Sequence, residues 1–486
     1  MCFSFGIIGS PVVSSFSVEV SAEESDLRIA TFEVDATPEL GSPLAYDPMV
    51  KVSDPLRCKG VVLLPTGDQP IVLATVDWLG VANESNAMFC GKLAEAVGTQ
   101  PNRVVVHALH QHDAPRCDHS AAALLEPYGI VDQCYDLPFI EATFESAATA
   151  AKEAIVSAVA VSTIQVGQAP VQRVASNRRM LDPTGQVHIT RYTACRDPLV
   201  RALPLGVIDP ALKLMTFEDA NGPVACLTFY ATHPQSYYRV GAATPDFPGL
   251  ARDTRQKATG VFHMHFNGAG GNIGAGKYND GSQENRPRLA RRVEEAMQTA
   301  WENRRPDNST ELNWQQQPVV LPISEAISVD VLAKTIADET QPASVRCHAA
   351  EKLAFAQRDE ESPVPISRLA IGNNTLMFMP GELFVEYQLA AQAMVPEKFV
   401  MMAAYGDYGT AYIGTRVSYS QGGYEVSPRA TNVSPKSELV LLQTMRKLLE
   451  AQVDGVTASD YTDATGPGPI NVQQLPGEAR PDETGR

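Results

Sequence analysis

Four histidines lie within thirteen residues of this chain, at positions 107, 110, 112 and 119. Three of them belong to the stretch HALHQHDAP that begins at His107 and follows the apolar run Val104–Val106. On an extended segment, His110 and His112 point to the same side. Neutral imidazole is the commonest side-chain metal ligand and also a general acid or base near neutral pH. The cluster therefore favours a metal or acid–base role over four unrelated structural histidines.

Three further segments place polar side chains after apolar, strand-like runs. His233 follows the run Val224–Tyr230 and precedes a proline, and Glu382 follows a Pro-Gly turn. Tyr412 begins the sequence Tyr-Ile-Gly-Thr, and Tyr424 lies close behind it. A tyrosine becomes a metal ligand where a dication favours its ionised form. Each of these residues taken alone is explained as well by an ordinary structural role.

The segment at 262–277 reads FHMHFNGAGGNIGAGK and is rich in glycine. It lacks the GxxxxGK[ST] order of a phosphate loop, and the third glycine of GxGxxG would fall on Ile273. One interpretation is a loop whose backbone approaches a ligand closely, with Asn267 and Asn272 as its polar groups. The other is a glycine-rich bend without a ligand.

The elements that must position these residues alternate between strand-like and helix-like patterns, which predicts a mixed α/β fold. We expect residues 27–453 to form one large domain and residues 455–486 to form a disordered tail rich in Gly, Pro, Thr and acids. Strands are expected at Leu27–Val34, Gly60–Leu64, Ile71–Asp77, Arg103–Leu109, Ser162–Val166, Val187–Tyr192, Lys213–Phe217, Val224–Tyr230 and Arg368–Met379. Helices are expected at Asn83–Val97, Phe139–Ala158, Arg286–Glu302, Val329–Ala337, Ala343–Arg358 and Ser437–Ala451.

Composition narrows the classes of partner. The 486 residues carry a net charge of −17, which repels nucleic acid and disfavours broad attachment to anionic lipid. Eight cysteines are scattered without a CxxC pair, which argues against a thiolate zinc knuckle. Disulfides and free buried thiols both remain open. The expected partner is a small-molecule or lipid substrate, and the sequence predicts no oligomeric state.

The N-terminal segment matches part of the description of a signal peptide. Residues 3–18 are apolar and small, and Val20-Ser21-Ala22 fits a cleavage site. A basic start is missing, and Glu19 interrupts the stretch. We expect residues 1–22 to be a signal peptide of a secreted or periplasmic protein, with a cytoplasmic protein as the alternative. No other segment approaches the roughly 18–20 apolar residues that span a bilayer.

Taken in order, the segments resemble the catalytic domain of the neutral/alkaline, non-lysosomal ceramidases, over roughly residues 28–450. The family's His-Thr-His-Ser-Gly-Pro motif matches residues 110–115, and its Phe-Ala-Val-His segment matches 230–233. Its Pro-Gly-Glu and Tyr-(Val/Ile)-Thr-Thr motifs match 380–382 and 412–415. The resemblance implies a zinc ion bound by His110, His233, Glu382 and Tyr412.

The same resemblance implies a reaction. His112, the second histidine of the paired motif, would position substrate or move protons. An Asn-Arg pair that lines the family's active site matches Asn177-Arg178. Zinc with an open coordination position activates water for attack on a carbonyl, and Arg178 or Tyr424 would steady the oxyanion. The expected activity is that of a zinc-dependent amidohydrolase acting on an N-acyl compound such as a ceramide-like lipid.

Departures from the family pattern leave the substrate open. The family's Gly-Asp-Asn-Lys-Gly reads Pro-Asp-Phe-Pro-Gly around Asp246, and Asn272 replaces an aspartate in the glycine-rich loop. We expect Asp246, Asn267 and Asn272 to contact substrate, and we expect no C-terminal immunoglobulin-like domain. A zinc esterase, a carbohydrate-related hydrolase and a non-catalytic secreted binding protein are the alternatives. Retention of all four ligand positions favours an enzyme.

Overall fold

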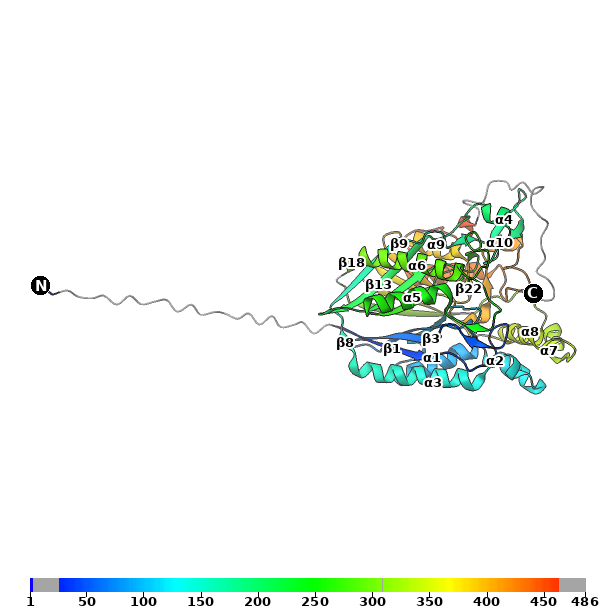
Figure 1. Cartoon of the computed structure of the whole chain (residues 1–486), viewed down its shortest axis with the longest axis horizontal. Helices are drawn as coiled ribbons and strands as arrows, with labels where there is room; N and C mark the ends of the chain where they lie inside the picture. Colours follow the sequence, from blue (N-terminus) through cyan, green and yellow to red (C-terminus); the bar gives the residue numbers. More distant parts are fainter. Residues whose placement is uncertain (3–25, 308, 463–486) are drawn as a thin grey trace.

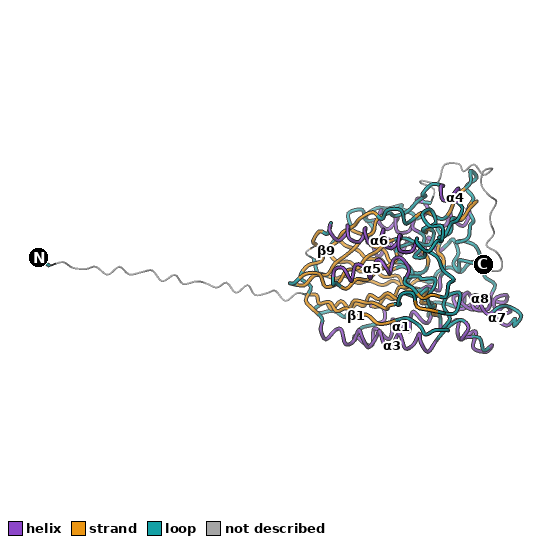
Figure 2. The backbone as a smooth tube through the Cα atoms, viewed as in Figure 1, coloured by secondary structure: helices purple, strands orange, loops and turns teal. Residues whose placement is uncertain are grey.

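The computed structural model describes residues 1–2, 26–307 and 309–462. The expected signal peptide, apart from its first two residues, lies outside the described residues. Three sheets, each with one parallel pair of strands, make up the fold, and helices cover their outer faces (Figures 1 and 2). The predicted mixed α/β class is confirmed.

The first sheet has the strand order β6-β4-β3-β1-β8. All of its pairings are antiparallel except β4–β6, which helix α1 connects. Figure 1 shows α1 and α3 along one face of this sheet, beside β1 and β3. The bounds are β1 Leu27–Asp35, β3 Arg57–Pro65, β4 Ile71–Val76, β6 Val104–Ala108, β8 Val159–Ala160, α1 Glu84–Val97 and α3 Leu137–Ala154.

The second and third sheets repeat this plan. The second sheet has the order β16-β14-β13-β9-β18, and α5 connects its parallel pair β14–β16. The third sheet has the order β19-β20-β21-β23, and α9 connects its parallel pair β21–β23. Their strands are β9 Thr163–Pro170, β13 Ala211–Asp219, β14 Gly222–Tyr230, β16 Phe262–Asn267, β18 Arg305–Asp307, β19 Leu312–Val319, β20 Val364–Ile371, β21 Asn374–Phe378 and β23 Phe399–Ala403. Their helices are α5 Asp246–Thr259, α6 Asn285–Glu302, α9 Val385–Met394 and α11 Ser437–Leu449.

Short strand pairs and peripheral helices complete the architecture. The strands are β2 Lys51–Val52, β5 Gly80–Val81, β7 Arg116–Cys117, β10 Ser176–Asn177, β11 Arg179–Leu181, β12 Val187–Thr190, β15 Ala242–Ala243, β17 Ile273–Gly274, β22 Glu382–Leu383 and β24 Tyr412–Ile413. The helices are α2 His119–Leu125, α4 Pro198–Ala202, α7 Val329–Ala337, α8 Ala343–Ala356 and α10 Arg416–Gln421.

One apolar cluster joins the three sheets at the centre. Successive strand residues point to opposite faces, so each strand serves two layers. Leu73 of β4, Leu227 of β14 and Leu376 of β21 belong to the shared central cluster. Their neighbours Val72 and Met377 lie in the outer clusters, which the helices cover. The sheets therefore pack on one another, and their strand ends are brought together.

The carboxyl ends of the three parallel pairs meet at one place. The backbone N–H of Ala108, at the end of β6, donates to the carbonyl of Tyr405 after β23. The N–H of Ala404 donates to the carbonyl of Asn267, the last residue of β16. Ligand sites in open α/β sheets lie beyond the carboxyl ends of strands. The fold therefore puts the segments after β6, β14 and β21 at a position suited to a site.

The sequence-based prediction was wrong in the third sheet and missed a helix at Asp246. The single strand expected at Arg368–Met379 is a hairpin of β20 and β21, which turns at Gly372 with φ +54°. The segment around Asp246, for which the sequence analysis predicted no helix, begins helix α5. Proline is tolerated in the first turn of a helix, where Pro248 stands, because its missing N–H has no partner there.

The described structure continues past residue 453, the expected end of the domain. Residues 455–462, assigned to the disordered tail, include a 3₁₀ turn at Ser459–Tyr461. Ala458 is fully buried, and the N–H of Ser459 donates to Glu438 on α11. Residues 463–486 lie outside the described residues.

The described cysteines include a disulfide and free buried thiols, the two possibilities that the sequence left open. Cys134 and Cys347 form a disulfide between the segment before α3 and helix α8, while Cys58, Cys90, Cys117 and Cys226 are free and buried. Within the described residues, no helix is both long and apolar enough to cross a bilayer.

A fully buried ion pair fastens α5 to the end of β4. Both guanidinium ends of Arg252 donate to the carboxylate of Asp77, at 2.7 and 2.9 Å. We expect Asp77→Ala to lower the free energy of unfolding by about 3–5 kcal/mol, because it leaves a buried charge without its partner. Denaturant titration measures the change. Asp253→Ala is the matched control: Asp253 contacts the same guanidinium but is 41% exposed, so we expect a loss of about 0–1 kcal/mol. Equal losses in the two variants would contradict this assignment.

Candidate metal centre

Three buried histidines converge beyond the strand ends. The Nε2 atoms of His110, His112 and His233 lie 3.2 Å from one another in every pair. His110 and His112 follow β6, and His233 follows β14, 123 positions further along the chain than His110. The three side chains form a group able to hold a metal ion. His107 and His119, the other members of the sequence cluster, point elsewhere, toward the carbonyl of Ala404 and toward Ser85.

The ring of His110 is held in one orientation. Its Nδ1 lies 2.8 Å from the carbonyl of Leu79, which accepts the ring proton and leaves Nε2 as the free lone pair. The His110 backbone has φ +60°, a left-handed conformation that costs a non-glycine residue energy. The fold keeps this strained conformation at the point where the side chain must turn into the cluster.

Glu382 brings a carboxylate to the same place. Its Oε2 lies 3.4 Å from His110 Nε2 and 3.7 Å from His233 Nδ1, and it has no hydrogen-bond partner among the described residues although it is buried. Its Oε1 accepts a 2.7 Å hydrogen bond from the Tyr408 hydroxyl. One carboxylate oxygen is therefore anchored, and the other is left facing two imidazoles.

Tyr412 is placed beside Glu382 by the backbone. The two residues are register partners in the parallel pair β22–β24, and the Tyr412 ring stacks parallel to that of His233 at 6.2 Å. The Tyr412 hydroxyl accepts a hydrogen bond from Arg178 Nη1 at 3.2 Å. Arg178 also pairs with the fully buried Glu425. The positive charge of Arg178 thus lies next to the oxygen on which a negative charge would form.

Burial sets the protonation of these groups. It lowers the pKa of His112 and of His233 well below the usual range, and the positive charge of Arg178 acts in the same direction. Both rings are therefore neutral at pH 7, which is the form that binds metal. Burial also raises the pKa of Tyr412 well above its usual value, and Glu382 adds to this while Arg178 opposes it. An ionised Tyr412 would thus need a dication beside it.

The donor set suits a dication of the zinc class. Two or three neutral imidazoles with a carboxylate are typical of catalytic zinc sites. The Oε2 of Glu382, which faces the cluster, is a buried polar atom that protein groups leave unsatisfied. Such atoms cost free energy unless something binds them. The residues present therefore fit a metal ion.

Aromatic rings surround His112 on the solvent side. Its ring stacks on Tyr46 at 5.5 Å and meets the edge of Tyr238 at 5.0 Å. Tyr46 is 42% exposed and Tyr238 is 38% exposed, whereas His112 is 9% exposed. These two tyrosines, which we did not single out from the sequence, separate the cluster from solvent.

The remaining predicted site residues fall into two groups. Tyr424 lies with the cluster: its ring is 5.8 Å from that of Tyr412, and Arg178 lies over it at 5.9 Å. The other three engage protein partners. Asp246 accepts from the backbone and hydroxyl of Ser236, and Asn267 donates to the carbonyl of Leu109. Asn272 donates to both carboxylate oxygens of Glu386 and accepts from the N–H of Val385. The contacts of Asp246 and Asn272 involve helices α5 and α9, and the Asn267 bond joins the ends of β16 and β6.

Two residues that support the proposed ligands, Tyr408 and Glu425, were not predicted from the sequence. Tyr408 and Glu425 act through Glu382 and Arg178, and nothing in their local pattern sets them apart from other polar residues. Tyr408 stands four positions before Tyr412, so a search of the motif's flanks would have included it.

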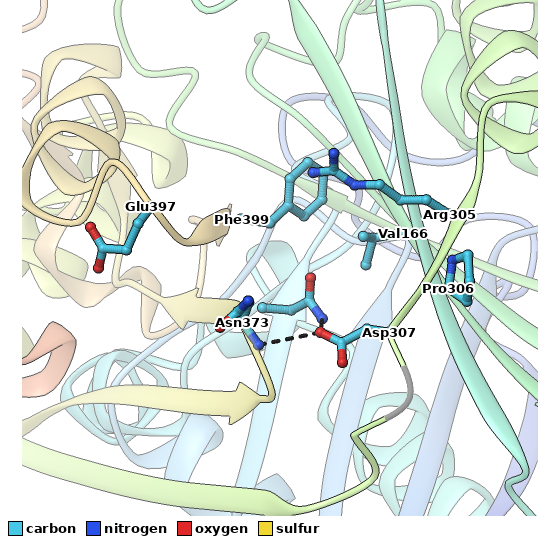
Figure 3. Close-up of a pocket in the computed structure, with 8 residues that line it drawn as sticks. Val166, Arg305, Pro306, Asp307, Asn373, Glu397 and Phe399 are labelled. Carbon is cyan, nitrogen blue, oxygen red and sulfur yellow. Dashed lines mark hydrogen bonds between the residues drawn. The ribbon is translucent and has the colours of Figure 1, made fainter.

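A cavity of about 440 Å³ lies away from this cluster (Figure 3). It borders Asn374 and Phe399, the first residues of β21 and β23, whereas Glu382 and Tyr412 follow the other ends of these strands. Asp307 accepts there from the N–H of Asn373 and from the side-chain amide of Asn374. No histidine lines this cavity.

The structure is similar to solved ceramidase structures. The neutral ceramidase from Pseudomonas aeruginosa matches with a TM-score of 0.65 at 17% identity, over 88% of this chain and 74% of that chain. A structure described as ceramidase complexed with C2 matches with a TM-score of 0.64 at 16% identity, over 87% and 75%. No protein-family model and no curated protein matches the sequence. The chain has a ceramidase-like fold, as its motifs predicted.

Proposed function

We propose that this protein is a zinc-dependent hydrolase that cleaves the amide bond of an N-acyl compound. The observation that carries the proposal is the convergence of His110, His112, His233 and Glu382 in a ceramidase-like fold. The proposed ligands are His110, His233, Glu382 and Tyr412. The register pairing of Glu382 with Tyr412 supports the last of these.

The residues around the proposed ion divide the work of amide cleavage. A bound zinc ion supplies Lewis acidity, which polarises a carbonyl and acidifies water at the site. His112 is buried and its Nε2 faces the cluster, so it is placed to accept a proton and later to pass it to the leaving nitrogen. The rings of Tyr46 and Tyr238 hold it in place.

Arg178 and Tyr424 are placed to stabilise negative charge at the site. Arg178 Nη1 lies 3.2 Å from the Tyr412 hydroxyl, so the guanidinium stabilises negative charge on that oxygen. Tyr424 is half-buried beside Arg178, and burial raises its pKa to about 12, so its hydroxyl stays protonated and can donate to a developing oxyanion.

Metal removal tests the proposal. We expect purified protein to hold about one zinc ion per chain. Dialysis against a chelator should abolish the hydrolysis of N-acyl substrates, and added zinc should restore it. The measurements are metal content by mass spectrometry and turnover of a panel of N-acyl amides, esters and glycosides.

The outcomes separate the alternatives. Folded protein that neither contains nor binds a divalent metal would end the zinc proposal. Zinc-loaded protein that turns over only esters or glycosides would keep the centre and replace the amidase activity. Zinc-loaded protein without turnover of any panel member would favour the non-catalytic binding protein.

A further inference from the structure

We propose that Tyr408 is a positioning residue that orients Glu382 for metal binding. This inference rests on the metal centre proposed above. Tyr408 touches neither the proposed substrate nor the ion, and acts through the carboxylate that it holds. Its hydroxyl contacts Glu382 directly, and its ring lies 5.3 Å from the ring of His110.

The first step is the hydrogen bond to Glu382. The Tyr408 hydroxyl donates to Oε1 at 2.7 Å, and the other oxygen, Oε2, faces His110 and His233 without a hydrogen-bond partner among the described residues. The terminal torsion of a glutamate is broad and has no sharp rotamer wells. Among the described residues, no other group donates a hydrogen bond to Oε1, so the tyrosine hydroxyl holds Oε1 away from the histidines and leaves Oε2 toward them.

The second step is the packing of the Tyr408 ring on Gly80. A Cβ atom at Gly80 would lie 2.5 Å from two carbons of this ring, so only glycine lets the ring approach so closely. The residue before it, Leu79, accepts the Nδ1 proton of His110. Two adjacent residues thus help to position two proposed ligands. Leu79 holds His110 through its carbonyl, and Gly80 leaves the space in which Tyr408 reaches Glu382.

The third step is the anchoring of the backbone at Asp407. The Asp407 carboxylate accepts from the backbone N–H groups of Asn83 and Gly409, at 3.0 and 3.1 Å, and pairs with Arg358. The peptide that carries Tyr408 is therefore fixed to α1 and to the end of α8. A side chain supported in this way is pre-organised to hold a ligand.

Tyr408→Phe removes the hydroxyl and keeps the ring that packs on Gly80. We expect the zinc dissociation constant to rise about 10–100-fold, the range that outer-shell partners of metal ligands contribute. The measurement is a competition titration of the metal-free full-length protein with zinc and a chromophoric chelator. The thermal midpoint of the metal-free protein should stay at that of the parent, because the ring packing is retained.

Tyr405→Phe is the matched control. Tyr405 is also buried, and its ring stacks on His110 at 4.8 Å, but its hydroxyl has no hydrogen-bond partner among the described residues. We expect its zinc affinity to equal that of the parent. Gly80→Ala, which displaces the Tyr408 ring and keeps the hydroxyl, should weaken zinc binding as well.

Parent-like zinc affinity in Tyr408→Phe would overturn the inference. So would equal weakening in Tyr405→Phe, since this would indicate a general loss of packing around His110. A parent protein that binds no zinc would instead overturn the proposed metal centre, so the two failures are distinguishable.

Discussion

Replacing His110 by alanine should remove the metal from this protein and the hydrolysis with it. His110 Nε2 lies within 3.4 Å of two other imidazoles and of Glu382 Oε2, so it is central to the donor group. We expect the zinc dissociation constant to rise by more than about 100-fold, beyond the range of outer-shell changes. Turnover should fall at least as far. Zinc titration and hydrolysis rates on the same preparation measure both effects.

The control for this variant is His119→Ala. His119 belongs to the same histidine-rich stretch, but its ring contacts Ser85 and Glu141 and lies outside the donor group. Its zinc content and turnover should match those of the parent. A His110→Ala protein that keeps its zinc would show that the ion, if present, is held elsewhere.

His112→Ala separates proton transfer from metal binding. We expect kcat/KM to fall about 10²–10⁴-fold, the usual contribution of a general acid–base residue, while zinc affinity stays near that of the parent. The reason is that Glu382 and Tyr412 complete the proposed ligand set without His112. Zinc titration, single-turnover hydrolysis and comparison with His110→Ala measure the two effects separately.

A loss of zinc affinity in His112→Ala would change the proposed ligand set. His112 Nε2 is as close to His110 and His233 as those two are to each other. A loss of zinc affinity equal to that of His110→Ala would assign His112 to the ligands. In that case Tyr412, whose hydroxyl is engaged by Arg178, would be the residue left outside the set.

Local patterns predicted most of the elements that carry the site. The apolar run before His110 and the run before His233 are β6 and β14, and both deliver their histidines directly after the strand ends. Alternation with period 2 is a property of neighbouring residues, so it can be read from the sequence. The same reasoning failed at Arg368–Met379, which was predicted as one strand. Gly372, with φ +54°, turns the chain there, and the two halves pair as β20 and β21.

The sequence by itself determined which side chains stand at strand ends and, through the order of its motifs, the ceramidase-like scaffold. Only the tertiary structure decided which of them meet. Asp246 and Asn272 were expected to contact substrate, yet their side chains are engaged by Ser236 and Glu386. Tyr408 belongs to none of the motifs identified in the sequence, yet its hydroxyl holds Glu382. Convergence depends on how three sheets pack through a shared core, and such long-range contacts leave no trace in the periodicity of any one segment.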